Sequence, residues 1–204
     1  MILNPTYLRA LSAIQATKKA RHAHLDGVQL VQDSTLNGTL TYTTTNGHVL
    51  VRVTHRTGLN PDPTLDRTVW FDREAIKQIP HDAIDVQADY ICGNGGDIRV
   101  EIIRANGLKT HFEPTELAST YPDCESVISS ATQPGTDTPE LNIWLDPTVC
   151  AGVMTACGKL GAETMQLTQP GGPGTPMVLT GTCGDDDDTV LALAMPKVTP
   201  DSHR

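Results

Sequence analysis

The sequence has few aromatic residues: they make up 4% of its 204 residues, although 38% of the residues are hydrophobic. A chain of this length suffices for one large domain or two small ones with a real core. That core must therefore be built mainly from Val, Leu, Ile and Ala. No run of 18 apolar residues occurs, which excludes a membrane-spanning helix. The first residues also lack the parts of a signal peptide, so we expect a soluble, cytoplasmic protein.

The sequence also lacks a recognisable cysteine pattern. Its five cysteines are odd in number and scattered, and no CxxC motif occurs: Cys92, Cys124, Cys150, Cys157 and Cys183. This pattern predicts reduced thiols with a structural role rather than a disulfide framework or a zinc site.

Other metal signals are incomplete. His22 and His24 lie two residues apart, but no matching ligand cluster accompanies them, which favours exposure to solvent over metal binding. The run "GDDDDT" (184–189) lacks the ligand spacing and the closing Glu of an EF-hand loop, so we interpret it as a solvated hairpin tip. We expect no metal site and no cofactor.

Signals for catalysis are equally weak. His48 follows a predicted turn, where a lone histidine is usually structural, and no motif in the chain supplies a nucleophile elbow. We therefore expect that the protein is not an enzyme.

Basic residues are in the minority, and the formal net charge is −9. However, residues 1–21 hold four basic residues and no acid, whereas the remaining chain holds 11 basic and 24 acidic residues, a net −13. An acidic body with one basic segment repels polyanions over most of its surface and attracts them at one face. A helix with solvated basic ends gives the same pattern, and charge alone does not distinguish the two.

Local patterns predict both helices and strands. Residues 5–17 predict a helix with Asn4 as N-cap and Pro5 in the first turn. Its apolar stripe consists of Tyr7, Leu8, Leu11 and Ile14. In "LTYTTTNGHVLVRVTH" (40–55), the Asn46-Gly47 pair between two β-prone runs predicts a hairpin.

This combination of a helix and about three strands recurs. "TVWFDREAIKQI" (68–79) predicts a strand and then a helix capped by Asp72, and residues from 141 predict the same with Asp146 as cap. Each is followed by predicted strands, so the chain contains three similar units, and we expect an α+β fold with antiparallel sheets. The polar, turn-rich residues 129–140 are predicted to be a linker between domains.

Four segments resemble the bacterial sliding clamp family, the DNA polymerase III beta subunit. "YTTTNGHVLV" (42–51) is similar to the family's Thr-Asp-Gly-His-Arg-Leu signature, and "HLDGVQLV" (24–31) to its Leu-x-Gly-x-x-Leu strand. "YPDCESVI" (121–128) resembles the Phe-Pro-Asp-Tyr segment that closes the middle domain. "LALAMPKV" (191–198) resembles the C-terminal apolar-Met-Pro ending. All four occur in the family's order.

The resemblance implies a shortened clamp made of three half-modules. Residues 1–128 are similar to a whole middle domain, with halves 1–56 and 67–128. Residues 141–198 are similar to the second half of the last domain, and residues 199–204 form a tail. Family rings contain twelve half-modules related by two-fold axes in the ring plane. Four copies of this chain would therefore close a ring, with like end meeting like end.

The resemblance also implies two kinds of binding residues. Double-stranded DNA would be contacted at its phosphates, without sequence specificity, by Arg9, Lys19, Arg21, Arg73 and Lys77. A peptide pocket for short segments with Leu and Phe anchors would be lined by Leu25, Thr45, Gly47, His48, Val49, Leu50, Leu193, Ala194, Met195 and Pro196. Val49 stands where the family has arginine, and Lys197-Val198 replaces Met-Arg, so the preferred peptide is expected to differ.

Two functions follow as alternatives. In the first, the protein is a DNA replication processivity factor: a homo-oligomeric ring around duplex DNA that tethers a polymerase and other partners. A clamp loader is a further candidate partner, and the sequence leaves open whether loading is needed. In the second, the protein is a clamp-like binding module that forms no ring and recruits, or competes for, clamp-binding proteins.

Overall fold

The structure is a computed structural model of the chain. It describes residues 2–14, 25, 27–33, 38–57, 67–90, 98–112, 121–133, 146–170, 175–184 and 188–196. Within these ranges the chain forms eleven strands and four helices, and every strand pair is antiparallel, which confirms the predicted α+β class. No helix in the same ranges is long and apolar enough to cross a membrane.

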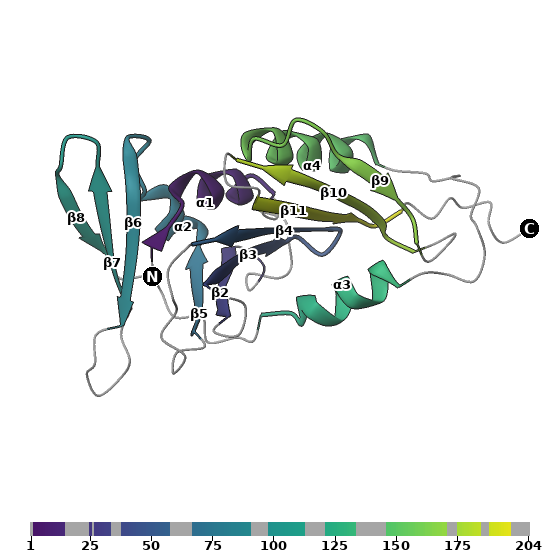
Figure 1. Cartoon of the computed structure of the whole chain (residues 1–204), viewed down its shortest axis with the longest axis horizontal. Helices are drawn as coiled ribbons and strands as arrows, with labels where there is room; N and C mark the ends of the chain where they lie inside the picture. Colours follow the sequence, from purple (N-terminus) through teal and green to yellow (C-terminus); the bar gives the residue numbers. More distant parts are fainter. Residues whose placement is uncertain are drawn as a thin grey trace, which may run out of the picture.

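Seven strands form one sheet, called the large sheet below. Its order is β5-β2-β3-β4-β11-β10-β9, so strands from both ends of the chain share it (Figure 1). The strands are β5 (Arg67–Asp72), β2 (Gly27–Asp33), β3 (Thr39–Thr45), β4 (Val49–Arg56), β11 (Asp188–Ala194), β10 (Met177–Cys183) and β9 (Gln166–Thr168).

The other four strands form the small sheet, in the order β1-β6-β7-β8. They are β1 (Ile2–Leu3), β6 (Ala83–Tyr90), β7 (Ile98–Arg104) and β8 (Lys109–Phe112). Figure 1 shows the small sheet at one end of the molecule and β9 and β10 toward the other, with β2 to β5 between them.

Helices cover both faces of the large sheet. Helices α1 (Pro5–Ser12) and α4 (Pro147–Lys159) lie on one face, and α3 (Cys124–Thr132) lies on the other (Figure 1). The short helix α2 (Arg73–Lys77) follows β5 and contacts α1. Because side chains alternate between the faces of a strand, consecutive residues of β4 serve both layers: Val49 and Val51 pack in the core under α1 and α4, whereas Leu50 packs in the smaller cluster under α3.

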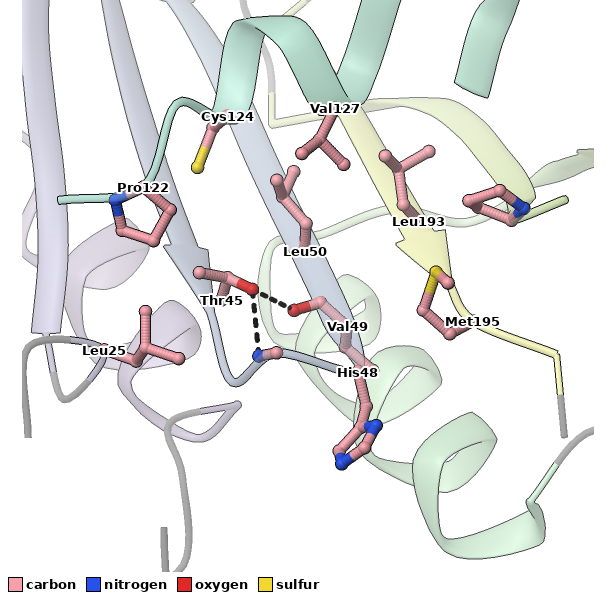
Figure 2. A pocket seen from close by; sticks show the side chains of 12 residues that line it. Leu25, Thr45, His48, Val49, Leu50, Pro122, Cys124, Val127, Leu193 and Met195 are labelled. Carbon is pink, nitrogen blue, oxygen red and sulfur yellow. Dashed lines mark hydrogen bonds between the residues drawn. The ribbon is translucent and has the colours of Figure 1, made fainter. Parts of the chain in front are cut away.

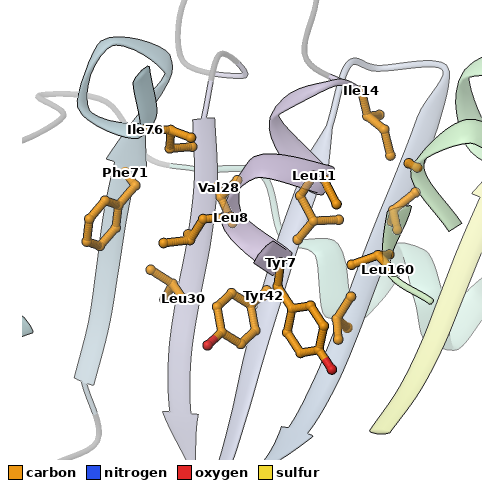
Figure 3. Close-up of a cluster of buried hydrophobic side chains, with 14 of the residues drawn as sticks. Tyr7, Leu8, Leu11, Ile14, Val28, Leu30, Tyr42, Phe71, Ile76 and Leu160 are labelled. Atoms are coloured by element: carbon orange, nitrogen blue, oxygen red, sulfur yellow. The ribbon is translucent and has the colours of Figure 1, made fainter. Parts of the chain in front are cut away.

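The main core is built around α1, as its apolar stripe predicts. Tyr7, Leu8, Leu11 and Ile14 are buried in one cluster with Val28, Leu30, Tyr42 and Phe71 of the large sheet, and Figure 3 shows Tyr7 and Leu8 beside Tyr42 and Leu30. Few aromatic rings take part, and most of the core is Val, Leu, Ile and Ala, as the composition predicts.

The predicted helix caps are confirmed. Side-chain oxygens accept backbone N–H groups at three N-termini: Asn4 from Thr6, Asp72 from Ala75, and Asp146 from Thr148. Such bonds satisfy N–H groups that the first helical turn leaves unpaired.

Two predicted boundaries differ from the structure. The first helix was expected over 5–17, but α1 ends at Ser12, where the N–H of Ala13 already turns back to the carbonyl of Ala10; residues 15–17 lie outside the described ranges. The linker was expected from 129, but α3 continues to Thr132 because Ala131 is buried against the sheet.

Candidate functional site

The hairpin after β3 and the end of β11 lie side by side. In the pairing of β4 with β11, called the seam below, Leu50 is opposite Leu193 and Val49 is opposite Ala194. Beyond the last strand residue, the N–H of Met195 still donates to the carbonyl of His48 at 2.9 Å. The seam thus brings together the two segments that were predicted to form a pocket.

The hairpin tip is held by its own side chains. The Asn46 side-chain oxygen accepts the N–H groups of His48 and Val49 at 3.0 and 2.9 Å, and the Thr45 hydroxyl donates to the carbonyl of Val49 at 2.7 Å. Gly47 has φ +86°, a conformation that side chains disfavour. His48 therefore lies in the turn itself and is exposed, whereas Val49 and Leu50 point into the fold.

A hollow of about 180 Å³ opens beside the seam (Figure 2). Its lining is mostly apolar, and the hydroxyl of Thr45 is already engaged within the hairpin. The lining residues are Leu25, Thr45, Gly47, His48, Val49, Leu50, Pro122, Cys124, Val127, Pro176, Leu193 and Met195. An apolar concavity of this kind suits one or two apolar side chains of a ligand rather than a charged group.

Eight of the ten predicted pocket residues line this hollow. The exceptions are Ala194, which is fully buried in the core on the opposite face of β11, and Pro196, which is not in the lining. The alternation of side chains along β11 explains the first exception: Leu193 and Met195 face the hollow, so Ala194 faces the core.

One wall of the hollow was not predicted. Cys124 and Val127 belong to the first turn of α3, and Pro122 lies just before the helix. Their segment had been noticed only as a sequence resemblance, and nothing in its local pattern shows which face of a sheet it covers. Two apolar side chains at the hollow remain exposed, Val127 by 45% and Met195 by 46%, so a ligand in the hollow would reach both of them.

The cysteine in this wall is poorly reactive at neutral pH. Cys124 is buried, and burial raises the pKa of its thiol to about 11. Cys183 lies in the main core, and burial raises its pKa to about 11 as well. Both therefore act as apolar side chains, as expected of structural thiols.

The residues predicted to face DNA are engaged within the protein where the structure describes them. The guanidinium of Arg9 donates to the carbonyl of Pro80 at 2.7 Å, and the ammonium of Lys77 contacts Glu74 at 2.6 Å. Arg73 is partly buried at the start of α2. Lys19 and Arg21 lie outside the described residues, as do His22 and His24.

A buried polar cluster links α1 to the large sheet. The hydroxyl of Tyr7 donates to Asp188 Oδ2 at 2.5 Å, the same oxygen lies 2.7 Å from His55 Nδ1, and the N–H of Arg56 donates to Asp188 Oδ1 at 3.2 Å. Asp188 is only 1% exposed. Burial and the neighbouring carboxylate raise the pKa of Tyr7 well above its usual value.

The expectation that residues 184–189 form a solvated tip is therefore wrong for Asp188. The reason is that β11 begins at this residue, and its side chain points under α1, where it meets a hydroxyl, an imidazole nitrogen and a backbone N–H. The approach of α1 requires a glycine nearby: a Cβ on Gly184 would lie 2.8 Å from the Tyr7 hydroxyl. Among the described residues, no group of three or more His, Cys, Asp or Glu side chains is arranged to hold a metal ion.

Comparison with proteins of known structure identifies the fold of the chain. No protein-family model matches the chain, and no curated protein matches its sequence. Solved structures do match. The beta subunit from the DNA polymerase of Streptococcus pyogenes matches with a TM-score of 0.64 and 16% sequence identity. The Caulobacter crescentus pol III beta matches with a TM-score of 0.63 and 12% sequence identity. The sliding clamp from Bartonella birtlesii, bound to griselimycin, matches with a TM-score of 0.59 and 13% sequence identity.

Each of these matches covers 98% of this chain but only 66% of the matched one. The chain therefore has the fold of DNA sliding clamps and spans about two thirds of the length of these clamps. This confirms the fold that the four sequence segments implied.

Proposed function

We propose that the protein is a sliding-clamp-like DNA replication processivity factor, which encircles duplex DNA as a homo-oligomeric ring and binds a polymerase and other proteins through the hollow beside the seam. The observation that carries this proposal is the hollow itself: a clamp fold in which the hairpin and the last strand together form an apolar concavity. The proposed role involves tethering and no catalysis.

The proposed ligand of the hollow is a short peptide with Leu and Phe anchors. Its apolar side chains would enter between Leu50, Leu193 and Met195 and exclude water from them. Met195→Ala shortens a side chain that is 46% exposed, so it should weaken binding of a labelled peptide without unfolding the protein. Met154→Ala is the matched control, because Met154 is 54% exposed on α4 and outside the lining. Equal affinities of the Met195 variant and the wild type would contradict the assignment.

A ring is proposed from the three half-modules. Their helices would be α1, α2 and α4, and each sheet offers one edge strand for contact with another copy: β8, opposite β1 in the small sheet, and β9, opposite β5 in the large sheet. In a ring of twelve half-modules, four copies would join through these ends, β8 to β8 and β9 to β9, which gives two-fold interfaces. The mass in solution tests this directly: a tetramer supports the ring, and a strict monomer at micromolar concentration refutes it.

DNA would be held by the basic residues of the inner helices. Arg9 is a poor probe because its guanidinium bonds to the carbonyl of Pro80, so its replacement would disturb the fold. Lys77 is exposed, and Lys19 belongs to the acid-free first segment. The double change Lys19→Glu and Lys77→Glu should reduce the amount of protein that loads onto closed circular DNA, and the effect should shrink as salt rises. Unchanged loading at low salt would exclude this face.

The alternative is a clamp-like binding module without a ring. Two observations favour it: the guanidinium of Arg9 and the ammonium of Lys77 are both engaged within the protein. A monomer that binds the peptide but is not retained on circular DNA would establish this alternative. A tetramer retained on circular but not on linear DNA would exclude it, because only a closed ring is trapped topologically.

A further inference from the structure

The hollow has walls of two different kinds. Thr45, Leu50 and Leu193 belong to strands of the large sheet, where ladders of backbone hydrogen bonds fix their positions. Cys124 and Val127 belong to the first turn of α3, and Pro122 lies just before it. This helix packs on the face of the sheet and adds no strand to it. The position of this second wall is set by side-chain contacts, and it is therefore the easier one to move.

An ion pair joins the second wall to the sheet. Nη1 of Arg52, on β4, lies 2.7 Å from Oε1 of Glu125 in the first turn of α3, and Nε of Arg52 donates to the Thr43 hydroxyl at 3.2 Å. The side chain of Arg52 is only 14% exposed, whereas that of Glu125 is 73% exposed. The guanidinium is thus fixed on the sheet, and the carboxylate reaches down to it from the helix.

The pair lies directly beside the hollow. Arg52 is two residues beyond Leu50 on β4, so both side chains are on the same face of the sheet. Glu125 is adjacent to Cys124 and two residues before Val127, which are both in the lining. A second contact supports the same wall: Tyr121 donates to the Thr43 carbonyl at 3.3 Å, and its ring lies 4.7 Å from that of Trp70.

We propose that Arg52 and Glu125 are positioning residues for the hollow: their ion pair holds the first turn of α3 against the sheet and thereby sets the width of the binding site. This inference rests on the proposed function of the hollow as a peptide site. Neither residue lines the hollow, so both act through Cys124 and Val127.

The inference predicts how charge changes affect peptide binding. Glu125→Gln removes the charge but not the bulk, and the dissociation constant should rise about two- to fivefold, the value of a partly exposed ion pair. Glu125→Lys adds repulsion of similar size, and the rise should be about tenfold. The double variant Arg52→Glu with Glu125→Lys restores an ion pair of opposite polarity and should recover most of the affinity.

A matched control separates this effect from a general effect of charge. Glu74, 76% exposed, lies in the first turn of α2 and contacts Lys77 at 2.6 Å, an ion pair in the same kind of position but away from the hollow. Glu74→Lys should leave the dissociation constant of the peptide unchanged. Raising the salt concentration should weaken binding to the wild type and have less effect on Glu125→Gln.

The test uses a fluorescent Leu/Phe-anchored peptide and, in parallel, amide hydrogen exchange of residues 121–133. Faster exchange of this segment in Glu125→Lys, reversed in the double variant, is the expected result together with the affinity changes. If the wild type binds and Glu125→Lys binds equally well, the inference is overturned and the proposed function stands. If the wild type does not bind the peptide, the proposed function fails; unchanged exchange in Glu125→Lys then overturns the positioning role as well.

Discussion

The buried hydrogen bond between Tyr7 and Asp188 allows a quantitative test of how α1 is held. Tyr7→Phe removes one oxygen and retains the ring, including its edge-to-face contact with Tyr42 at 5.6 Å. A hydrogen bond to a carboxylate contributes about 1.5–3 kcal/mol. We therefore expect the free energy of unfolding at neutral pH to fall by that amount, measured by urea denaturation.

Tyr121→Phe is the matched control for this change. It removes a hydroxyl whose partner is a neutral carbonyl, that of Thr43, at 3.3 Å. The expected loss is about 0.5–1.5 kcal/mol, smaller than that of Tyr7→Phe. If the two variants lose equal stability, a hydrogen bond to the Asp188 carboxylate contributes no more than one to a neutral carbonyl.

The same pair predicts a pH dependence with a defined sign. Burial and Asp188 raise the pKa of Tyr7 above its ordinary value near 10, so above about pH 10 the unfolded chain loses this proton and the folded chain keeps it. The free energy of unfolding must then fall as pH rises, by up to about 1.4 kcal/mol per pH unit. Burial raises the pKa of Tyr42 and Tyr121 as well, so each adds a similar slope.

Tyr7→Phe removes one of these three contributions. The stability difference between wild type and variant should be constant up to about pH 9 and should shrink above about pH 10, by up to about 1.4 kcal/mol per pH unit. Stability curves that remain parallel from about pH 8 to about pH 11 would refute the reasoning, because Tyr7 would then titrate alike in both states.

Three further predictions concern single features of the fold. Gly47→Ala should destabilise the protein by about 1–2 kcal/mol, because the φ angle of Gly47 is +86°. Gly152→Ala should stabilise it by about 0.5–1 kcal/mol, because Gly152 lies within α4 and a Cβ there would meet open space. Equal shifts of the melting temperature in the two variants would contradict this. Asp146→Ala should cost about 1 kcal/mol in urea unfolding and Asp146→Asn much less, since only alanine loses the cap on Thr148; equal losses would show that the cap is unimportant. The rate at which iodoacetamide alkylates Cys124 should keep rising with pH up to about pH 11. Mass spectrometry measures this rate, with the less buried Cys150 as internal reference. A rate that levels off near pH 9 would show an ordinary thiol.

Features that depend on neighbouring residues could be predicted from the sequence. The caps at Asn4, Asp72 and Asp146 and the hairpin at Asn46-Gly47 need only a few consecutive residues, and all four are present. The α+β class followed from the repeated pattern, whereas the pocket residues were reached through a resemblance and not through physical reasoning.

Features that depend on distant residues could not be predicted. Asp188 is buried because Tyr7, 181 positions earlier, donates to it, and an acidic run at a turn carries no sign of such a partner. Tyr121 donates to the carbonyl of Thr43, 78 positions earlier, so the position of the α3 wall of the hollow could not be predicted from local sequence either. Arg9 appears in the sequence as a free cation, and only the fold places its guanidinium on the Pro80 carbonyl.

The seam has a consequence for how the chain is made. During synthesis, β4 can complete its pairing only after β11 has left the ribosome, because Val49 pairs with Ala194 near the other end of the chain. Until then, a nascent chain with β2 and β3 in place presents the open edge of β4, which invites association with other chains. Contacts between such distant residues also slow folding. We therefore expect chains that stop before β11 to aggregate.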